Sequence, residues 1–199
     1  METTSRKAEQ TAATRAALIA AARELFAQRG YAAVGTEEIV RAARVTRGAL
    51  YHHFAGKEDL FRAVFEEMEA ELAQQLAEVA AGASEPFEAL RLGAAGFLDA
   101  CDEPAVQRIV LIDAPSVLGW EQWREIGERY GAGLVQLALE AAMDSGAIER
   151  QPVRPLTHML LGALDEAAMY VARADDAKTA RREVGETVER MLEGLKPRS

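Results

Sequence analysis

Residues Arg44–Phe61 read RVTRGALYHHFAGKEDLF, a stretch that sets two adjacent histidines, a tyrosine and several cations on an apolar skeleton. Thr46 is placed to cap a short helix running to about Phe54, because a threonine oxygen can accept a hydrogen bond from a free backbone N–H of the first turn. Leu50 and Phe54 are four residues apart and therefore share one face of that helix. We expect this face to point into a core, which leaves the polar residues outside.

The segments on either side also have a helical pattern. Apolar residues recur at helical spacing through Thr14–Arg29, and Gly30 follows as a stop signal. Thr36 is placed to cap a second short helix, and a long helix is predicted from Lys57 to about Gly82. A helix, a short helix, a tight turn and another short helix make the pattern of a helix-turn-helix.

The outer face of the third helix has the chemistry of a surface that reads DNA. The residues that face solvent together are Arg47, Gly48, Tyr51 and His52. Arginine can donate two hydrogen bonds to guanine, histidine and tyrosine can donate to phosphates or base edges, and the small residues Gly48 and Ala49 let the backbone approach closely. The sequence therefore predicts double-stranded DNA as a partner.

Two other interpretations explain this surface less well. A metal site on a helix requires histidines three or four residues apart, whereas His52 and His53 are neighbours whose side chains diverge by about 100°. No metal ligands are therefore expected. Each polar residue, taken singly, is compatible with an ordinary exposed surface, but the joint pattern favours DNA.

The charge distribution supports different partners for the two parts of the chain. The 199 residues carry a net charge of −9, which by itself argues against binding a polyanion. Residues 1–62 contain ten Lys and Arg against seven Asp and Glu, or +3, which leaves −12 for residues 63–199. The positive charge is thus concentrated where the helix-turn-helix pattern lies.

Composition narrows the class of protein further. The single cysteine, Cys101, excludes an intrachain disulfide framework and a multi-cysteine metal cluster. No apolar run approaches the roughly 18 residues of a membrane span, so no membrane partner is expected. The first residues, METTSRKAEQ, lack the pattern of a signal peptide, and a cytoplasmic location is therefore expected.

The C-terminal half is also predicted to be helical, which makes the chain all-α. Breaks at CDEP, APSVLG, SGAIERQP and ADD separate helices expected at Pro86–Ala100, Pro104–Ala114, Glu121–Ser145, Pro155–Ala174 and Lys178–Leu195. With the four N-terminal helices, the total is nine. This half contains no P-loop, G-x-S-x-G, H-E-x-x-H or G-x-G-x-x-G motif, so neither catalysis nor a cofactor is expected.

The C-terminal half contains many large apolar side chains and a few polar ones. Such a mixture lines small-molecule cavities, but it also builds ordinary helical cores. His158 is interpreted as a packed core histidine in preference to a general base. Asp113 follows the apolar run IVLI, where an unpaired carboxylate would be costly, and the alternative is that it caps the turn ahead of Trp120. The candidate effector contacts are Phe97, Asp113, Trp120, Trp123, His158 and Tyr170.

The stretch LIAAARELFAQRGYAAVGTEEIVRAARVTRGALYHHFAGKEDLF, residues 18–61, resembles the DNA-binding signature of the TetR family of bacterial transcriptional repressors. The resemblance implies that Thr46–Phe54 is the recognition helix and that Thr36 and Lys57, at helix starts, contact phosphates, which suits helix N-termini. The DNA contacts then expected are Thr36, Arg44, Thr46, Arg47, Gly48, Ala49, Tyr51, His52 and Lys57.

Two positions depart from the family pattern. Arg44 stands where glycine is usual in the turn, at a cost of about 1 kcal/mol if the left-handed conformation is kept, and it could supply an extra phosphate contact. Gly56 stands where a serine often caps the fourth helix, a change that costs only a few tenths of a kcal/mol.

The resemblance also implies an architecture and a function. A helix-turn-helix domain at residues 1–62, with 1–12 flexible, would precede a helical effector-binding and dimerisation domain at 63–199. The segment LIDAPSVLGWEQWR resembles a subgroup of TetR-like regulators. The function expected is a homodimeric repressor of palindromic operators, released by a small, mostly apolar effector. The alternatives are control by a protein partner or an architectural role without a small ligand, and a helical enzyme without a known motif.

The last two predicted helices are the expected dimer contact, because the family pairs them with their twofold mates in a four-helix bundle. Each carries an apolar stripe at helical spacing. The stripes are Leu156, Leu160, Leu164, Ala167 and Val171 on one helix, and Val184, Val188, Met191 and Leu195 on the other.

Overall fold

The computed structural model describes residues 2–197, and within that range it contains helices and no strands. The first four helices are α1 (Glu2–Arg29), α2 (Thr36–Ala42), α3 (Arg47–His53) and α4 (Lys57–Ala81). The rest of the chain folds into α5 (Pro86–Ala100), α6 (Pro104–Val106), the π-helix η1 (Gln107–Asp113), α7 (Ala114–Leu118), α8 (Trp120–Asp144), α9 (Val153–Ala172) and α10 (Ala177–Glu193). Because α6, η1 and α7 follow one another without a break, the described chain has the predicted nine continuous helical segments.

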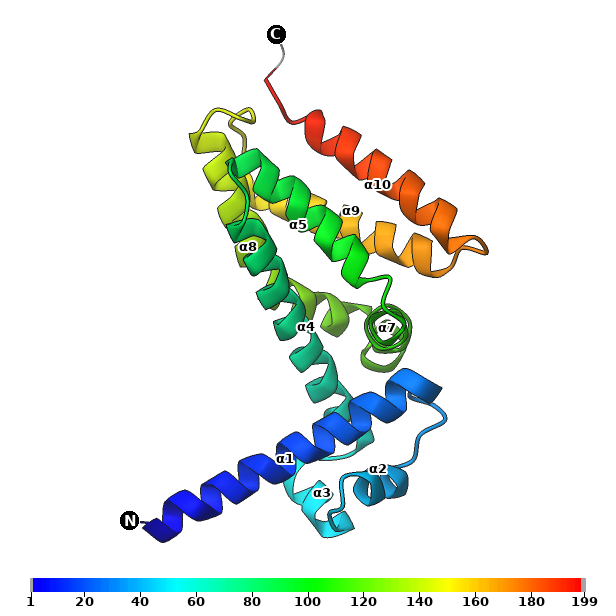
Figure 1. The fold of residues 1–199 in the computed structure, drawn as a ribbon. Coiled ribbons are helices and arrows are strands. Elements are labelled where there is room, and N and C mark those ends of the chain that lie inside the picture. The colour runs from blue at the N-terminus through cyan, green and yellow to red at the C-terminus, as the bar shows by residue number, and fades with distance from the viewer. Residues whose placement is uncertain (1, 198–199) are drawn as a thin grey trace.

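Helices α1 to α3 form the lower part of the molecule in Figure 1, and α4 rises from them into the upper part. Helix α1 begins at Glu2, well before the predicted Thr14, so residues 2–12 are helical, and their flexibility stays a prediction. The predicted domain boundary between Arg62 and Ala63 falls inside α4. One rigid helix thus belongs to both parts of the chain.

An aromatic cluster joins α1, the loop after it and α4. The ring centroids of Phe26 and Phe61 are 5.3 Å apart, and Tyr31 lies 5.6 Å from Phe26 and 5.1 Å from Phe61. Edge-on and tilted contacts of this kind add about 0.5–1.5 kcal/mol each beyond the area they bury. A further link is the ion pair between Arg23 on α1 and Glu71 on α4, at 2.7 Å. The cluster packs the start of α4 against α1 and the loop after it.

In the upper part, α4, α5, α8, α9 and α10 pack around the continuation of the same apolar core, in which Cys101 is buried as a small apolar residue. Gly119, with φ of 81°, makes the sharp turn between α7 and α8. The apolar stripes of the last two helices point mainly inward. Leu160, Leu164 and Val188 are all buried in the chain itself. These residues pack in the core of the chain itself, as apolar stripes more often do, and the pairing of the last two helices with a second copy stays a prediction that rests on the resemblance.

Candidate nucleic-acid interface and internal cavity

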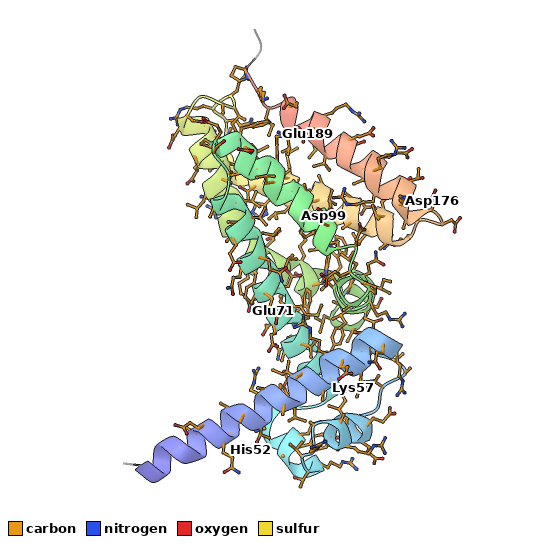
Figure 2. The ribbon with its side chains drawn as sticks, viewed as in Figure 1. His52, Lys57, Glu71, Asp99, Asp176 and Glu189 are labelled. Carbon is orange, nitrogen blue, oxygen red and sulfur yellow. The ribbon has the colours of Figure 1, made fainter. Side chains whose placement is uncertain are left out.

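The recognition helix α3 faces as its spacing predicted. Leu50 is fully buried and Phe54 is 4% exposed, whereas Tyr51 is 48% exposed. His52 is also exposed, and in Figure 2 it lies at the lower edge of the molecule, away from α4. The apolar pair therefore anchors the helix, and the polar face is open to a partner.

Arg47 is held loosely on this face. Its guanidinium carbon lies 5.6 Å from the centroid of the Tyr51 ring, and an Nη atom lies 3.8 Å from a carboxylate oxygen of Glu37. The side chains of Arg47 and Glu37 are 66% and 81% exposed, so water screens the pair and little energy holds it. Arg47 is thus free to exchange Glu37 for a base edge or a phosphate.

The start of α3 is capped as expected, and the start of α2 is not. Thr46 Oγ1 accepts a hydrogen bond of 3.2 Å from the backbone N–H of Ala49. Thr36, predicted to be a cap, is the first residue inside α2, and the extended residue Gly35 precedes the helix. Glu38 takes the place of a capping side chain, since its Oε2 atom accepts a hydrogen bond of 3.2 Å from the backbone N–H of Gly35.

Glu38 also accepts a 2.8 Å hydrogen bond from Arg29, at the end of α1. These contacts, chiefly the one with Arg29, lower the pKa of the Glu38 carboxyl group. The carboxylate thereby links the end of α1 to the start of α2. Thr36 remains partly exposed beside it, where a hydroxyl can still reach a phosphate.

Arg44 adopts the left-handed conformation that was anticipated for the turn, with φ of 55°. It is the single non-glycine residue with positive φ within 2–197. The backbone N–H of Arg44 donates to Arg41 O at 3.2 Å, and that of Val45 donates to Val40 O at 3.0 Å. This pair of bonds is the Schellman arrangement that ends a helix at a left-handed residue. Arg44 is exposed beside α3, and glycine would suit its backbone better.

Lys57 has an internal role that the sequence did not reveal. Its Nζ atom donates hydrogen bonds of 3.0 Å to Tyr31 O and to Val34 O, and lies 3.9 Å from the centroid of the Tyr31 ring. The helix dipole repels a cation at the first residue of a helix. The place of Lys57 at the start of a predicted helix was therefore the one sign in the sequence that another group stabilises its charge. One ammonium hydrogen is left for the expected phosphate contact.

A polar joint connects the DNA-binding helices to the upper part of the chain. Asp113 Oδ2 accepts a 2.7 Å hydrogen bond from the backbone N–H of Tyr31, and it lies 3.5 Å from Arg108 Nε. The Arg108 guanidinium covers Gly30, where a Cβ atom would lie 1.9 Å from an Nη atom. The Asp113 side chain makes no capping hydrogen bond at the turn before Trp120, and it is not in the wall of the cavity between α4, α5, α8 and α9, because the loop after α1 uses its carboxylate.

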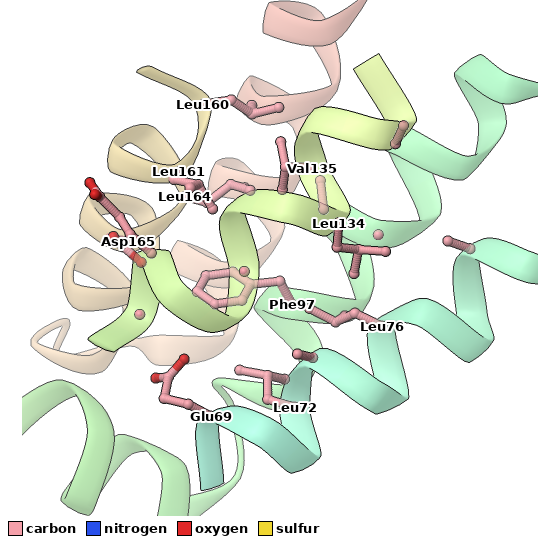
Figure 3. A pocket seen from close by; sticks show the side chains of 18 of the residues that line it. Glu69, Leu72, Leu76, Phe97, Leu134, Val135, Leu160, Leu161, Leu164 and Asp165 are labelled. Carbon is pink, nitrogen blue, oxygen red and sulfur yellow. The ribbon is translucent and has the colours of Figure 1, made fainter. Parts of the chain in front are cut away.

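A cavity of about 100 Å³ lies in the upper part, between α4, α5, α8 and α9. Its wall is mostly aliphatic, with two aromatic side chains, Phe97 and Trp123. The Phe97 ring lies near the middle of the view in Figure 3. The side chains that Figure 3 labels around it are Glu69, Leu72, Leu76, Phe97, Leu134, Val135, Leu160, Leu161, Leu164 and Asp165. A small apolar ligand fits this wall, because such sites combine apolar surface with few polar groups.

Only some of the predicted effector contacts meet at this cavity. Phe97 and Trp123 line it, and Trp123 Nε1 donates a 2.9 Å hydrogen bond to Val110 O. Trp120 and Tyr170 are 55% and 57% exposed and do not line it, because each lies on the outer face of its helix. His158 is half-exposed, contrary to the expected core histidine, and its Nδ1 atom lies 3.1 Å from a carboxylate oxygen of Glu128, which does line the cavity.

Three acidic residues of the cavity were missing from the predicted set of contacts. Glu69, Glu128 and Asp165 lie among the lining residues. Burial raises the pKa of Glu69 to about 7, with a further contribution from the negative charge of Asp165. Burial also raises the pKa of Asp165 to about 6, although Arg124 opposes the shift. The signal for Glu69 was its place between Phe65 and Leu72, where an acidic residue interrupts the apolar face of the long helix.

Within the part of the chain that the structure describes, neither a metal site nor a membrane-spanning helix is present. No group of three or more His, Cys, Asp and Glu side chains there is arranged to hold a metal ion. Among the same residues, no helix combines the length and the hydropathy needed to cross a bilayer.

Similarity to known proteins covers both parts of the chain. Residues 18–64 match the family of bacterial regulatory proteins called tetR, and residues 87–195 match the tetracyclin repressor-like C-terminal domain. A TetR-family transcriptional regulator from Pectobacterium atrosepticum has the same fold, with a TM-score of 0.86 and 33% identity over 96% of this chain and 98% of that one.

Two more distant relatives extend the comparison. The transposon Tn10 TetC protein of Escherichia coli is 26% identical over 85% of this chain and 86% of its own length. The regulator RolR, solved with resorcinol, shares the fold at a TM-score of 0.71, with 22% identity over 96% of this chain and 98% of RolR. Since one match covers the helix-turn-helix and the other more than half of the sequence, the chain belongs to the TetR family of transcriptional regulators.

Proposed function

We propose that this regulator is a cytoplasmic repressor that binds palindromic operator DNA as a homodimer and is released by a small, mostly apolar effector. As a TetR-family member it is a DNA-binding protein and not an enzyme. The proposal adds the sign of regulation, the symmetry of the operator and the effector. It is supported chiefly by the path of α4, which starts beside the recognition helix and supplies Glu69, Leu72 and Leu76 to the cavity.

This path gives a physical route from ligand to DNA. A ligand that pushes on the later turns of α4 tilts the helix, and the aromatic cluster at its start carries α1 to α3 with it. In a dimer, the tilt changes the separation of the two recognition helices, which must enter successive major grooves about 34–36 Å apart. A coupling of about 1–3 kcal/mol is enough for an allosteric effect of useful size. The enclosed cavity favours a small effector over control by a protein partner.

The dimer contact is proposed on the outer faces of α9 and α10. Met159 and Tyr170 on α9 and Met191 on α10 are large apolar side chains left exposed by the fold, at 72%, 57% and 40%. Pairing with a second copy would cover them, and large exposed apolar groups rimmed by polar ones often mark such contacts.

The test is a selection of bound fragments from random duplex DNA, followed by titration of the selected operator at several salt concentrations. A palindrome bound by two chains, with affinity falling steeply as salt rises, is expected. Ligands that bind the cavity should then weaken operator binding, and operator should weaken their binding by the same factor. A cavity ligand whose affinity does not change at saturating operator would contradict release by an effector.

A further inference from the structure

The acidic side chains at the cavity outnumber the basic side chains that pair with them. Asp165 pairs with Arg124 at 3.2 Å, and the same arginine pairs with Glu128 at 3.1 Å. His158 lies on the far side of Glu128. Glu69 has no hydrogen bond or ion pair with any described residue, and its one electrostatic neighbour of note is Asp165, which repels it. Arg124 and His158 therefore serve Asp165 and Glu128, and Glu69 is left without a cation.

The apolar surroundings of Glu69 make its ionised form unfavourable. Glu69 lies on the cavity side of α4 among Phe65, Met68 and Leu72, all buried. Glu69 is half-buried, so its carboxylate loses part of its hydration without gaining a hydrogen bond or an ion pair, and its pKa rises to about 7. Leucine or methionine there would continue the apolar stripe of α4. A half-buried carboxylate without a hydrogen bond or ion pair is unusual, and such exceptions occur mostly at functional sites. At a binding site, the ligand can supply the group that pairs with the carboxylate.

Figure 3 shows how this charge lies relative to the apolar wall. The carboxylates of Glu69 and Asp165 lie on one side of the Phe97 ring, and Leu76 and Leu134 lie on the other. A molecule occupying the cavity would thus meet negative charge at one end and hydrocarbon at the other. Its volume is of the order of the cavity that holds a single benzene ring, about 150 Å³, so one ring or a short branched chain sets the size.

We propose that the cavity binds a small apolar amine, whose protonated nitrogen pairs with the free carboxylate of Glu69 while its hydrocarbon body packs on Phe97, Leu72 and Leu76. The proposal rests on the proposed function and specifies the chemical class of its effector. Ligands that carry a carboxylate are excluded, because they would bring a further negative charge towards Glu69 and Asp165 in a low-dielectric site. Neutral analogues of the same shape lose the ion pair and bind more weakly.

The test compares three head groups on one body. Titration calorimetry of the full chain at pH 8 measures benzylamine, benzyl alcohol and benzoate, and the isobutyl series of the same head groups repeats the comparison at smaller size. Within at least one series we expect the amine to bind 10-fold or more tightly than the alcohol, and the carboxylate not to bind. Glu69→Gln should reduce that preference to less than 3-fold while the alcohol keeps its affinity, which shows that the cavity is intact. Glu67→Gln, an exposed position on the same helix, should change neither.

The outcomes separate this inference from the proposed function. Equal affinity for amine and alcohol, an unchanged preference in Glu69→Gln, or no binding by either amine would overturn the amine site. In the first two cases, release of operator by these ligands would still support an effector-controlled repressor. Amine binding that depends on Glu69 but leaves operator affinity unchanged would uphold the inference and contradict release by an effector.

Discussion

The backbone N–H of Tyr31 and the carboxylate of Asp113 are joined by a 2.7 Å hydrogen bond that ties the loop after α1 to the end of the π-helix η1. The same π-helix places Val110 and Leu111 in the cavity wall and Arg108 over Gly30. It is thus a second connection between cavity and DNA-binding helices, beside α4. π-Helical segments are uncommon and occur often at functional sites.

Asp113→Ala should therefore destabilise the chain by about 1–3 kcal/mol, because it leaves the half-buried N–H of Tyr31 without its partner. It should also weaken the effect of any cavity ligand on operator binding. Chemical denaturation and operator titration measure the two effects. Asp144→Ala is the control, since Asp144 is 70% exposed and pairs only with Arg150 in the structure. Equal stability of the two variants would show that the joint contributes nothing.

Leu50→Ala should destabilise the chain by about 2–5 kcal/mol, because it empties a fully buried site under the recognition helix. His52→Ala removes an exposed side chain two residues away and should change the free energy of unfolding by less than about 0.5 kcal/mol. Thermal melts followed by circular dichroism compare the variants. A reversed order would mean that the face of α3 turned towards DNA has been misassigned.

Arg47→Ala should relax base preference by about 1–3 kcal/mol at one position of the operator, as expected when a bidentate contact to guanine is lost. Lys57→Ala should instead weaken all sequences alike, because a phosphate contact carries no base information. Competition binding against operators with single base changes distinguishes the two. If Arg47→Ala keeps the wild-type preference, Arg47 is a phosphate contact as well.

Arg44→Gly should stabilise the fold by about 1 kcal/mol, since glycine adopts the left-handed turn without the steric penalty that arginine has there. Arg41→Gly makes the same change inside α2 and should destabilise by a similar amount, because its backbone is helical. Denaturation midpoints give both values. If Arg44 contacts phosphate as expected, Arg44→Gly also lowers affinity for every DNA sequence, and unchanged affinity would remove it from the contact set.

Glu69→Gln should stabilise the chain at pH 8 by about 1–3 kcal/mol and leave it nearly unchanged at pH 4.5. The ordinary pKa of 4.5 rises to about 7 in the fold, so between these values the unfolded chain has released a proton that the folded chain retains. Stability of the wild type therefore falls as pH rises through this window and is level above it.

The titratable groups that interact with Glu69 are Asp165 and Cys101. Asp165 in turn pairs with Arg124, which also pairs with Glu128, and Glu128 lies beside His158. Asp165, with a pKa raised to about 6, contributes in the same direction, so the quantity to measure is the difference between wild type and Glu69→Gln at each pH. Urea denaturation from pH 4.5 to 8, with Glu67→Gln as control, provides it. A constant difference across the range would mean that Glu69 titrates normally.

The sequence by itself determined the helices and the DNA-reading face, because both depend on residues close together in the chain. Leu50 and Phe54 orient α3 through a four-residue spacing, and Thr46 caps it through a neighbouring N–H. For Arg44, the left-handed turn was implied by the resemblance to the TetR family, which usually has glycine there, and the structure has it with φ of 55°. Helical periodicity and turn chemistry are local, so they can be read without knowing which helices meet.

Only the tertiary structure decided which distant residues share a site. Asp113 meets Tyr31 across 82 positions, Lys57 reaches back to the carbonyl of Tyr31 across 26, and Glu69 on α4 faces Asp165 on α9. Trp120 and Tyr170 have the same apolar character as Phe97 yet lie outside the cavity, because crossing angles between helices decide which face turns inward. The apolar periodicity of a sequence identifies the buried face of a helix, but the packing of the other helices determines which residues that face contacts.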